Sequence, residues 1–306
     1  MTRLRVGTRG SDLALRQTRW VCDLIRAVHA GVEFEEVVIK THGDIATGQP
    51  LDTDFPVGGF VSAIERALLD GRIDFAVHSY KDLPTAATPG LMIAAVPTRE
   101  APHDVLVTRH PVDLLNLPRG MRLGTSSPRR AAQFRRLADV QIVPIRGNVP
   151  TRVAKVGRGE VDGVVLAAAG LKRLGLRPPN LIDLPVDRFV PAPAQGALAV
   201  QVREGESTAR LLSAIEHRPS RWAVEAERSF LRHLHAGCHT PVGALASISG
   251  TTINLHGQLF SDDGLRMVDG GEAGNDSHTV GARLADCLAQ QLQLGQSVPR
   301  PSGSGQ

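Results

Sequence analysis

The chain of 306 residues has only three cysteines, Cys22, Cys238 and Cys287, and they lie far apart. Cysteines so few and so scattered do not make a disulfide framework. They favour the reducing cytoplasm, where a single thiol stays free and reactive. The chain also lacks any run of about 18 apolar residues, so no membrane-spanning helix is expected. Its first residues lack the long apolar segment of a signal peptide.

Lysine and aromatic residues are also scarce. Of the 35 lysine and arginine residues only four are lysine, aromatic residues make up 4% of the chain, and the net charge is +4. Without basic runs interleaved with aromatic residues, the composition gives little support to nucleic-acid binding. Arginine is, however, the side chain best suited to binding a carboxylate or phosphate through two parallel hydrogen bonds. Most of the arginines are expected to be solvated surface residues, and a few are candidates for binding an anion.

The order of apolar runs and helical patterns predicts two α/β domains followed by a smaller α+β domain. Strands alternate with helices up to about residue 174, which implies mostly parallel sheets. The segment 41–59, rich in Gly, Pro, Asp and Thr, predicts a long mobile loop. Residues 191–203 are Pro-rich and then strand-like, as expected for a crossing between domains. Strands are predicted at 4–6, 34–39, 74–78, 104–108, 122–124, 140–145 and 163–166, and helices at 60–70, 127–138, 148–157 and 168–174. A further helical pattern runs from Leu13 to Val28, with Ser11 or Asp12 as its expected N-cap.

Beyond residue 206 the pattern changes. Two helical stretches, 206–216 and 219–234, precede the segment around Cys238. Alternating patterns at 244–249, 253–260 and 265–268 then predict an antiparallel sheet, followed by a helix at 278–294.

Two segments bring Gly, hydroxyl and Arg residues to a strand-to-helix junction: Gly7–Ser11 and Gly124–Arg130. A helix N-terminus offers free backbone N–H groups and a partial positive charge, both of which favour an anion. Simple helix capping would explain each segment alone. Further basic residues follow later strands, at Arg146–Asn148, Arg152 and Lys172–Arg173. Together they imply a ligand with several negative groups, which polyphosphate, nucleic acid or a polycarboxylate would satisfy.

The segment AVHSYKDLP ends a predicted strand at Ser79 and continues with Lys81 and Asp82. A simple ion pair between Lys81 and Asp82 would explain these two charged residues. Alternatively, Asp82 is a carboxylate held ionised among cations. Such a group stabilises a positive charge that develops on a substrate, or transfers a proton.

Cys238 lies in the segment HAGCHTPVG, close to His233, His235 and His239. A zinc site would normally need a second, separated ligand pair, and the sequence has none. A disulfide with Cys22 or Cys287, a small buried thiol and a reactive thiolate in a Gly-flanked loop all stay open.

Seven ordered segments resemble the porphobilinogen deaminase (hydroxymethylbilane synthase) family over about residues 3–300: GTRGSDLAL, AVHSYKDLP, GTSSPRRAAQ, RGNVPTR, AGLKRLGL, PAPAQGALAV and AGCHTPVG. The resemblance implies two α/β domains like the lobes of type II periplasmic binding proteins, at residues 1–98 with 195–214 and at 99–194. It further implies a small α+β C-terminal domain at 215–300, which carries the cofactor cysteine, and a disordered tail at 301–306.

The resemblance implies a transferase of tetrapyrrole (haem) biosynthesis. Such an enzyme deaminates four molecules of its substrate porphobilinogen and joins them head to tail on a dipyrromethane cofactor, bound through a thioether to Cys238. Hydrolysis then releases linear hydroxymethylbilane. The implied protein is a cytoplasmic monomer, and no metal, nucleic acid or membrane partner is expected.

The same resemblance assigns roles to individual residues. Asp82 is the catalytic residue and would stabilise the cationic azafulvenium-like intermediate formed as ammonia leaves. Phe60 is a lid residue. The cofactor-binding residues are Cys238, Lys81, Asp82, Thr125, Ser126, Ser127, Arg129, Arg130 and Arg173. The substrate-binding residues are Arg9, Ser11, Ser79, Arg146, Asn148, Arg152 and Gln195.

Two departures from the family pattern are visible. The loop at 41–59 lacks the lysines that many family members have there and carries Asp52 and Asp54 instead. Pro150 stands where a small residue is more usual, but proline fits the first turn of a helix. Neither change removes a core catalytic residue, so an active enzyme is expected.

Overall fold

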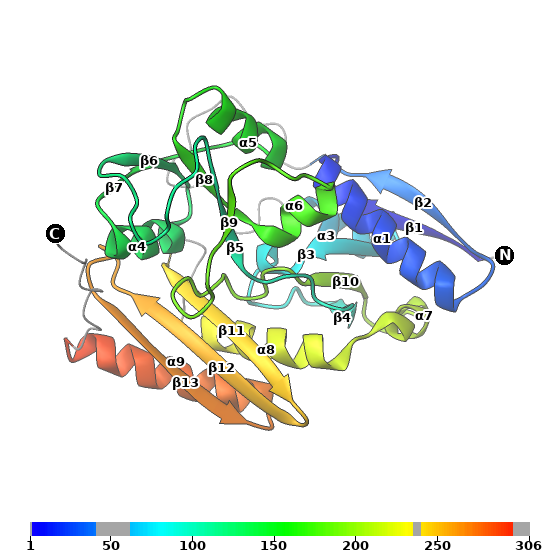
Figure 1. Cartoon of the computed structure of the whole chain (residues 1–306). Helices are drawn as coiled ribbons and strands as arrows, with labels where there is room; N and C mark the ends of the chain where they lie inside the picture. The colour runs from blue at the N-terminus through cyan, green and yellow to red at the C-terminus, as the bar shows by residue number, and fades with distance from the viewer. Residues whose placement is uncertain (1, 41–61, 235–239, 296–306) are drawn as a thin grey trace. The chain divides into compact units, whose positions relative to one another are not determined.

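The structure, a computed structural model, describes residues 2–40, 62–234 and 240–295. The chain divides into two compact units. The first unit contains residues 1–100 and 196–222, and the second contains residues 101–195 and 223–306. Each unit is built around its own sheets (Figure 1).

The first unit holds a five-stranded sheet in the order β2-β1-β3-β10-β4. Strands β1, β2 and β3 are parallel, whereas β10 is antiparallel to both of its neighbours, β3 and β4. The strands are β1 (Thr2–Thr8), β2 (Val32–Val38), β3 (Phe75–Ser79), β4 (Leu91–Ala95) and β10 (Leu198–Arg203). The helical elements are α1 (Asp12–Val28), α3 (Ser62–Leu69), η1 (Tyr80–Asp82), α7 (Thr208–Leu212) and η2 (Ser213–Ile215).

Alternation along β3 gives this sheet two buried faces. Phe75 belongs to the core cluster that includes Val21 of α1. The next residue, Ala76, belongs to a second cluster with Ile64 of α3. The helices α1 and α3 therefore cover opposite faces, and the strand ends between them are left to carry polar residues.

The second unit holds a five-stranded sheet in the order β7-β6-β8-β5-β9. Three neighbouring parallel strands are again followed by one antiparallel strand, β5, and then by a fifth. The strands are β5 (Asp104–Thr108), β6 (Met121–Gly124), β7 (Val140–Val143), β8 (Gly163–Ala167) and β9 (Leu181–Asp183), with helices α4 (Pro128–Leu137), α5 (Val149–Gly157) and α6 (Ala168–Leu174). The two five-stranded sheets thus repeat one topology.

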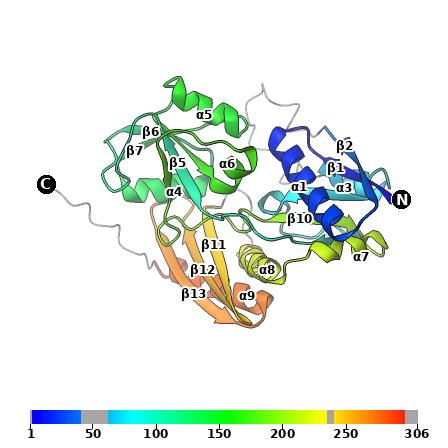
Figure 2. The same cartoon turned by 45° about the vertical axis from the view of Figure 1, so that its right-hand side comes forward.

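A separate antiparallel sheet, β11-β12-β13, completes the second unit. Its strands are β11 (Val242–Ser249), β12 (Thr252–Phe260) and β13 (Met267–Gly274). Helices α8 (Arg218–His233) and α9 (Ser277–Gln293) pack against it (Figure 2). Gly257 of β12 lies against Phe230 of α8 and Leu284 of α9, where a larger side chain would not fit.

The predicted fold class is confirmed: two α/β sheets and a small C-terminal antiparallel sheet. The predicted helices and strands are also present, most of them within a few residues of their expected ends, but the strand predicted at 265–268 extends to Gly274 as β13. The expectation of mostly parallel sheets missed the antiparallel directions of β5 and β10. The short strands β4 and β9 were not predicted. The second compact unit joins residues 223–306 to residues 101–195, and the proposed boundaries of three domains stay a prediction.

Every helix within the described ranges is too short or too polar to cross a lipid bilayer.

Candidate active site

The first group of predicted site residues lies at the carboxyl ends of β1 and β3. These strands are parallel neighbours, with Val6 opposite Phe75, so Arg9 and Asp82 follow them at the same edge of the sheet. Ser11 caps α1, since its side chain accepts a hydrogen bond from the backbone N–H of Ala14 at 3.4 Å. The capping role expected from the sequence is therefore confirmed for Ser11.

The turn after β3 is anchored on two buried residues. The backbone N–H of Tyr80 donates to Ala197 O at 3.0 Å, and that of Leu83 donates to Tyr80 O at 3.3 Å. Both side chains are buried, whereas Lys81 and Asp82 between them are exposed. The turn thus holds the Asp82 carboxylate at the surface of a fixed backbone.

Ser79 is oriented by a residue that the sequence analysis did not single out. The Nε2 of Gln17, a buried side chain on α1, lies 2.9 Å from Ser79 Oγ. No local pattern pointed to Gln17, because its partner is 62 residues away along the chain.

The second group of predicted site residues begins at the end of β6. Ser127 caps α4 by accepting from the N–H of Arg130 at 3.4 Å, and Thr125 Oγ1 accepts from the N–H of Ser127 at 3.1 Å. The Ser126 hydroxyl donates to Ile145 O at 2.8 Å and accepts from Ile145 N–H at 3.0 Å. Ser126 therefore ties the start of α4 to the segment that leads into Arg146.

The segment after β7 leads directly into α5. Asn148 caps this helix by accepting from the N–H of Thr151 at 2.9 Å, and Pro150 fits its first turn. The Nε of Arg152 donates to Gly147 O at 2.8 Å. Burial lowers the pKa of the Arg152 guanidinium, and the positive charge of Arg130 lowers it further. Two cationic side chains are therefore held close to each other here.

The sheet order places these segments together. Strands β6, β7 and β8 are parallel neighbours, so the loops that follow them lie at one edge of the second sheet. Helix α6 follows β8 and carries exposed Lys172 and half-buried Arg173 in its last turn. The predicted site residues thus form two groups, one on each unit.

Arg129 and Arg130 are more deeply buried than a surface cradle would suggest. Arg129 Nη2 donates to Asp104 Oδ2 at 2.8 Å, and Arg130 Nη2 donates to Asp104 Oδ1 at 2.6 Å. Asp104 is fully buried, and Gln195 Nε2 donates to its Oδ1 at 2.8 Å. Burial would raise the pKa of the Asp104 carboxyl, but the two guanidiniums hold it well below its ordinary value. The sequence analysis placed Asp104 only at the start of a strand.

Gln195, predicted to bind substrate, is fully buried. Its side-chain amide donates to Pro102 O at 2.7 Å as well as to Asp104. The residue before it, Ala194, has a left-handed backbone with φ of 62°. The N–H of Ala194 donates to the buried carboxylate of Glu227 at 2.6 Å.

Two predicted residues, Cys238 and Phe60, lie outside the described residues, as do the loop at 41–59 and the tail at 301–306. In the ranges that the structure covers, no cluster of three His, Cys, Asp or Glu side chains has an arrangement suited to a metal ion.

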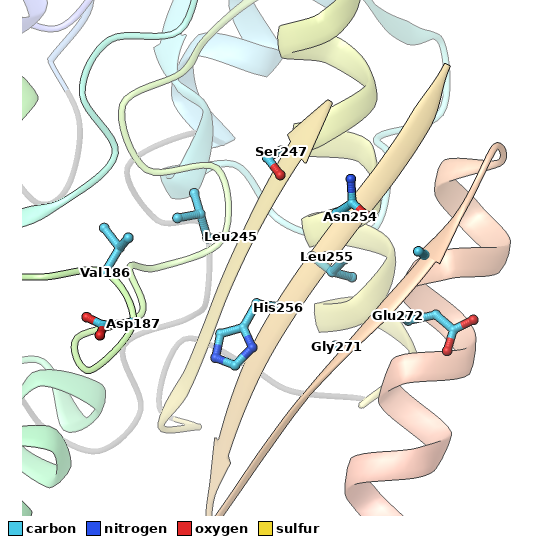
Figure 3. Close-up of a pocket in the computed structure, with 10 residues that line it drawn as sticks. Val186, Asp187, Leu245, Ser247, Asn254, Leu255, His256, Gly271 and Glu272 are labelled. Atoms are coloured by element: carbon cyan, nitrogen blue, oxygen red, sulfur yellow. The ribbon is translucent and has the colours of Figure 1, made fainter. Parts of the chain in front are cut away.

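A pocket of about 620 Å³ lies against strands β11, β12 and β13 and the loop at Val186 and Asp187 (Figure 3). Its lining includes His256 and Glu272. The predicted site residues are not part of this lining, so the pocket is separate from both groups.

The fold and the two polar groups define an α/β protein with two sheets of one topology, each with hydroxyl and basic side chains suited to an anionic ligand. Residues 4–210 match the family model described as "Porphobilinogen deaminase, dipyromethane cofactor binding domain". Residues 222–290 match the family's C-terminal domain. The chain belongs to the porphobilinogen deaminase family.

Relatives match along nearly the whole chain. Porphobilinogen deaminase of Roseiflexus castenholzii is 43% identical over 291 residues, covering 94% of this chain and 95% of the relative. The enzyme of Thermus thermophilus is 46% identical over 293 residues, covering 94% and 95%. A solved ancestral cationic amino-acid solute-binding protein is 16% identical with a TM-score of 0.43, covering 70% of this chain and 87% of that one. The predicted family and its transferase function in tetrapyrrole biosynthesis are confirmed.

Proposed function

We propose that this chain is a hydroxymethylbilane synthase that joins four porphobilinogen molecules on a dipyrromethane held by a thioether to Cys238, and then releases the linear product by hydrolysis. The observation that carries the proposal is the family match over residues 4–210 and 222–290. The position of Asp82 at the end of β3, in the same unit as Arg9 and Ser11, supports it.

The residues of the second unit fit a polycarboxylate such as dipyrromethane. The Nε atom of Arg130 is buried and has no hydrogen-bond partner among the described residues. The Arg152 guanidinium lies close enough to Arg130 for their like charges to interact unfavourably. A carboxylate bound there would accept a hydrogen bond from Arg130 Nε. Because it carries the opposite charge, it would also offset the repulsion between Arg130 and Arg152.

The proposed cofactor contacts follow from that fit. Arg129, Arg130, Arg173 and Lys81 would bind carboxylates as charged donors. Thr125, Ser126 and Ser127 lie at the N-terminus of α4, where hydroxyl and backbone N–H groups favour an anion. When bound, the dipyrromethane would supply the free pyrrole carbon to which the first unit is joined.

Asp82 is proposed as the catalytic residue. Its carboxylate is exposed on a turn fixed by Tyr80 and Leu83, so it is available to a ligand without rearrangement of the backbone. As ammonia leaves porphobilinogen, positive charge develops on the pyrrole, and the Asp82 oxygens stabilise that charge and can hold the pyrrole N–H proton.

The substrate brings an acetate and a propionate on each ring. Arg9, Arg146 and Arg152 are proposed to bind these carboxylates as charged donors, with Ser11, Ser79 and Asn148 adding neutral polar groups. The buried Gln195 amide, which donates to Pro102 O and Asp104, would act on the substrate only through Asp104. The proposed lid residue is Phe60. We further propose a cytoplasmic monomer. The free thiols of buried Cys22 and exposed Cys287 are consistent with a reducing compartment.

Asp82→Asn tests the catalytic assignment. The amide keeps the shape of the side chain but cannot offset a full positive charge, so turnover of porphobilinogen should fall at least about 100-fold. The intact mass should still include the cofactor, because the thioether is not made by Asp82. Asp23→Asn is the matched control, since Asp23 is an exposed carboxylate on α1 of the same unit. Near-normal turnover of Asp82→Asn would remove Asp82 from the catalytic role.

A further inference from the structure

Asp104 is the centre of a buried hydrogen-bond network in the second unit. Its carboxylate accepts from Arg129 Nη2 at 2.8 Å, from Arg130 Nη2 at 2.6 Å and from Gln195 Nε2 at 2.8 Å. The Asp104 side chain is 1% exposed, and those of Arg129 and Arg130 are 5% and 9% exposed. All of these contacts are therefore made away from solvent.

The network also holds the Nη1 atom of each guanidinium, which does not contact Asp104. Arg129 Nη1 donates to Gln133 Oε1 at 3.0 Å and to Val190 O at 2.9 Å. Arg130 Nη1 donates to Val165 O, the backbone of β8, at 2.9 Å. Each guanidinium is thus held at two nitrogen atoms, and neither can rotate without breaking a hydrogen bond.

The same network reaches the C-terminal sheet. Gln133 Nε2 donates to Gln258 Oε1 of β12 at 3.0 Å. Beside it, Ala132 of α4 packs on Phe260 and Met267 at the end of that sheet. Both views show α4 next to this end of the strands (Figures 1 and 2). The arginine pair is therefore attached to the sheet that follows Cys238 in the chain.

The charges leave this cluster with an unsatisfied positive group. One carboxylate faces two guanidiniums, so Asp104 neutralises only one of them, and Arg152 adds a third cation beside Arg130. The Nε of Arg130 is buried with no hydrogen-bond partner among the described residues. A buried donor without an acceptor is unfavourable, so this atom is best satisfied by a ligand anion.

We infer that Asp104 is a positioning residue: it fixes Arg130, together with Arg129, so that Arg130 Nε is directed at a carboxylate of the bound pyrrole chain. This role rests on the proposed function. It differs from the direct contacts assigned there, because Asp104 acts only through the two guanidiniums and has no free oxygen for a ligand. Gln195 completes the arrangement by occupying the remaining position on Asp104 Oδ1.

Asp104→Asn is the test. The asparagine has the same shape, but its amide nitrogen cannot accept, so at least one guanidinium loses its acceptor and its counter-charge. The fraction of purified protein that carries the dipyrromethane adduct, read from the intact mass, should fall about tenfold or more, as expected for one lost charge-assisted hydrogen bond.

Asp162→Asn is the matched control. Asp162 binds Arg122 through both oxygens in the same unit, but this pair is about 40% exposed and belongs to neither group of site residues. Both variants should be expressed and purified side by side, with circular dichroism and melting temperature recorded. The control should keep the wild-type adduct fraction even where its melting temperature falls.

Three outcomes would overturn the inference. The first is a folded Asp104→Asn that carries the wild-type adduct fraction, and the second is an Asp162→Asn that loses as much adduct at an equal loss of melting temperature. If Asp104→Asn does not fold, Asp104→Glu replaces it, because glutamate keeps the charge but displaces both oxygens. Folded Asp104→Glu with a full adduct then overturns the inference, and a reduced fraction supports it. If the wild-type protein itself carries no adduct, the proposed function fails. If the wild type carries the adduct and Asp104→Asn is unaffected, only the inference fails, so the two failures can be told apart.

Discussion

At the scale of the residue, His78 is a buried histidine next to the predicted site residue Ser79. It lies on β3 one residue before Ser79 and is 6% exposed. Burial lowers the pKa of its imidazole to about 4, and the neighbouring Gln201 side chain opposes this only in part. Gln201 in turn donates to Glu65 Oε1 at 2.9 Å, and Thr88 donates to the other oxygen of Glu65 at 2.9 Å. A neutral histidine is therefore built into the strand that leads into Asp82.

This burial predicts a defined pH dependence. Between pH 6.5 and about 4 the unfolded chain binds a proton at His78 that the folded protein excludes, so folding becomes less favourable as the pH falls. The loss is about 1.4 kcal/mol per pH unit, or about 3 kcal/mol across the window. Above pH 6.5 His78 is neutral in both states and contributes nothing to the slope.

Urea unfolding of the wild type and of His78→Leu at pH 7 and pH 4 checks this prediction. Both proteins lose stability in acid through their carboxylates, but only the wild type should lose the additional amount from His78. Parallel pH curves for the two proteins would contradict the prediction.

The sequence predicted some residue roles and not others, for a physical reason. Capping by Ser11 and Ser127 could be expected from their segments, because a helix cap binds a backbone N–H three residues away. Asp104 was not found, because its partners lie 25, 26 and 91 residues away along the chain. Nothing local to position 104 shows that a folded chain will bring two arginines to it.

At the scale of the element, the packing of α8 on α9 depends on one glycine. A Cβ atom at Gly281 would lie 2.5 Å from Ala226 O and 2.6 Å from Phe230 N, both backbone atoms of α8. Backbone cannot move aside as a flexible side chain can. The two helices therefore approach closely only because residue 281 has no side chain.

Gly281→Ala should destabilise the protein by about 2 kcal/mol, through the separation of α8 and α9. The matched control is Gly157→Ala at the end of α5, where a Cβ would meet nothing within 4 Å. Alanine there should be neutral or should stabilise by up to about 1 kcal/mol, because it is the better helix former. Equal midpoints of urea unfolding for the two variants would argue against the close contact.

Element types were largely predictable, whereas strand directions were not. Apolar periodicity of 3.6 or 2 residues reports which face is buried, so it identified most helices and strands. It does not report the direction from which the chain enters a sheet. Strands β5 and β10 are antiparallel because the chain reaches them from the crossing segments near residues 101 and 195. The three-residue strand β9 is too short to show any periodicity.

At the scale of the whole molecule, both five-stranded sheets place their fourth strand antiparallel, and in each case that strand adjoins a crossing segment. Each unit then presents polar residues at the carboxyl ends of its parallel strands. Full-length similarity at 43% and 46% identity accounts for why the ordered motifs could identify the family from the sequence alone. Local chemistry at Cys238 could not do so, because it left a disulfide, a buried thiol and a reactive thiolate open.

The central claim is that Cys238 carries the dipyrromethane. The other two cysteines provide internal comparisons. Burial raises the pKa of the Cys22 thiol to about 12, so it is not a ready nucleophile, and Cys287 is an exposed thiol on α9. Cys287 is exposed but is not the proposed attachment site, so it tests whether exposure alone is enough for a cysteine to carry the cofactor.

The most direct measurement is the intact mass of the purified protein beside Cys238→Ser and Cys287→Ser. The wild type and Cys287→Ser should exceed their sequence masses by the dipyrromethane adduct, a few hundred daltons, and consume porphobilinogen. Cys238→Ser should have its sequence mass and no turnover. A fully active wild-type protein with an unmodified Cys238 would contradict the account.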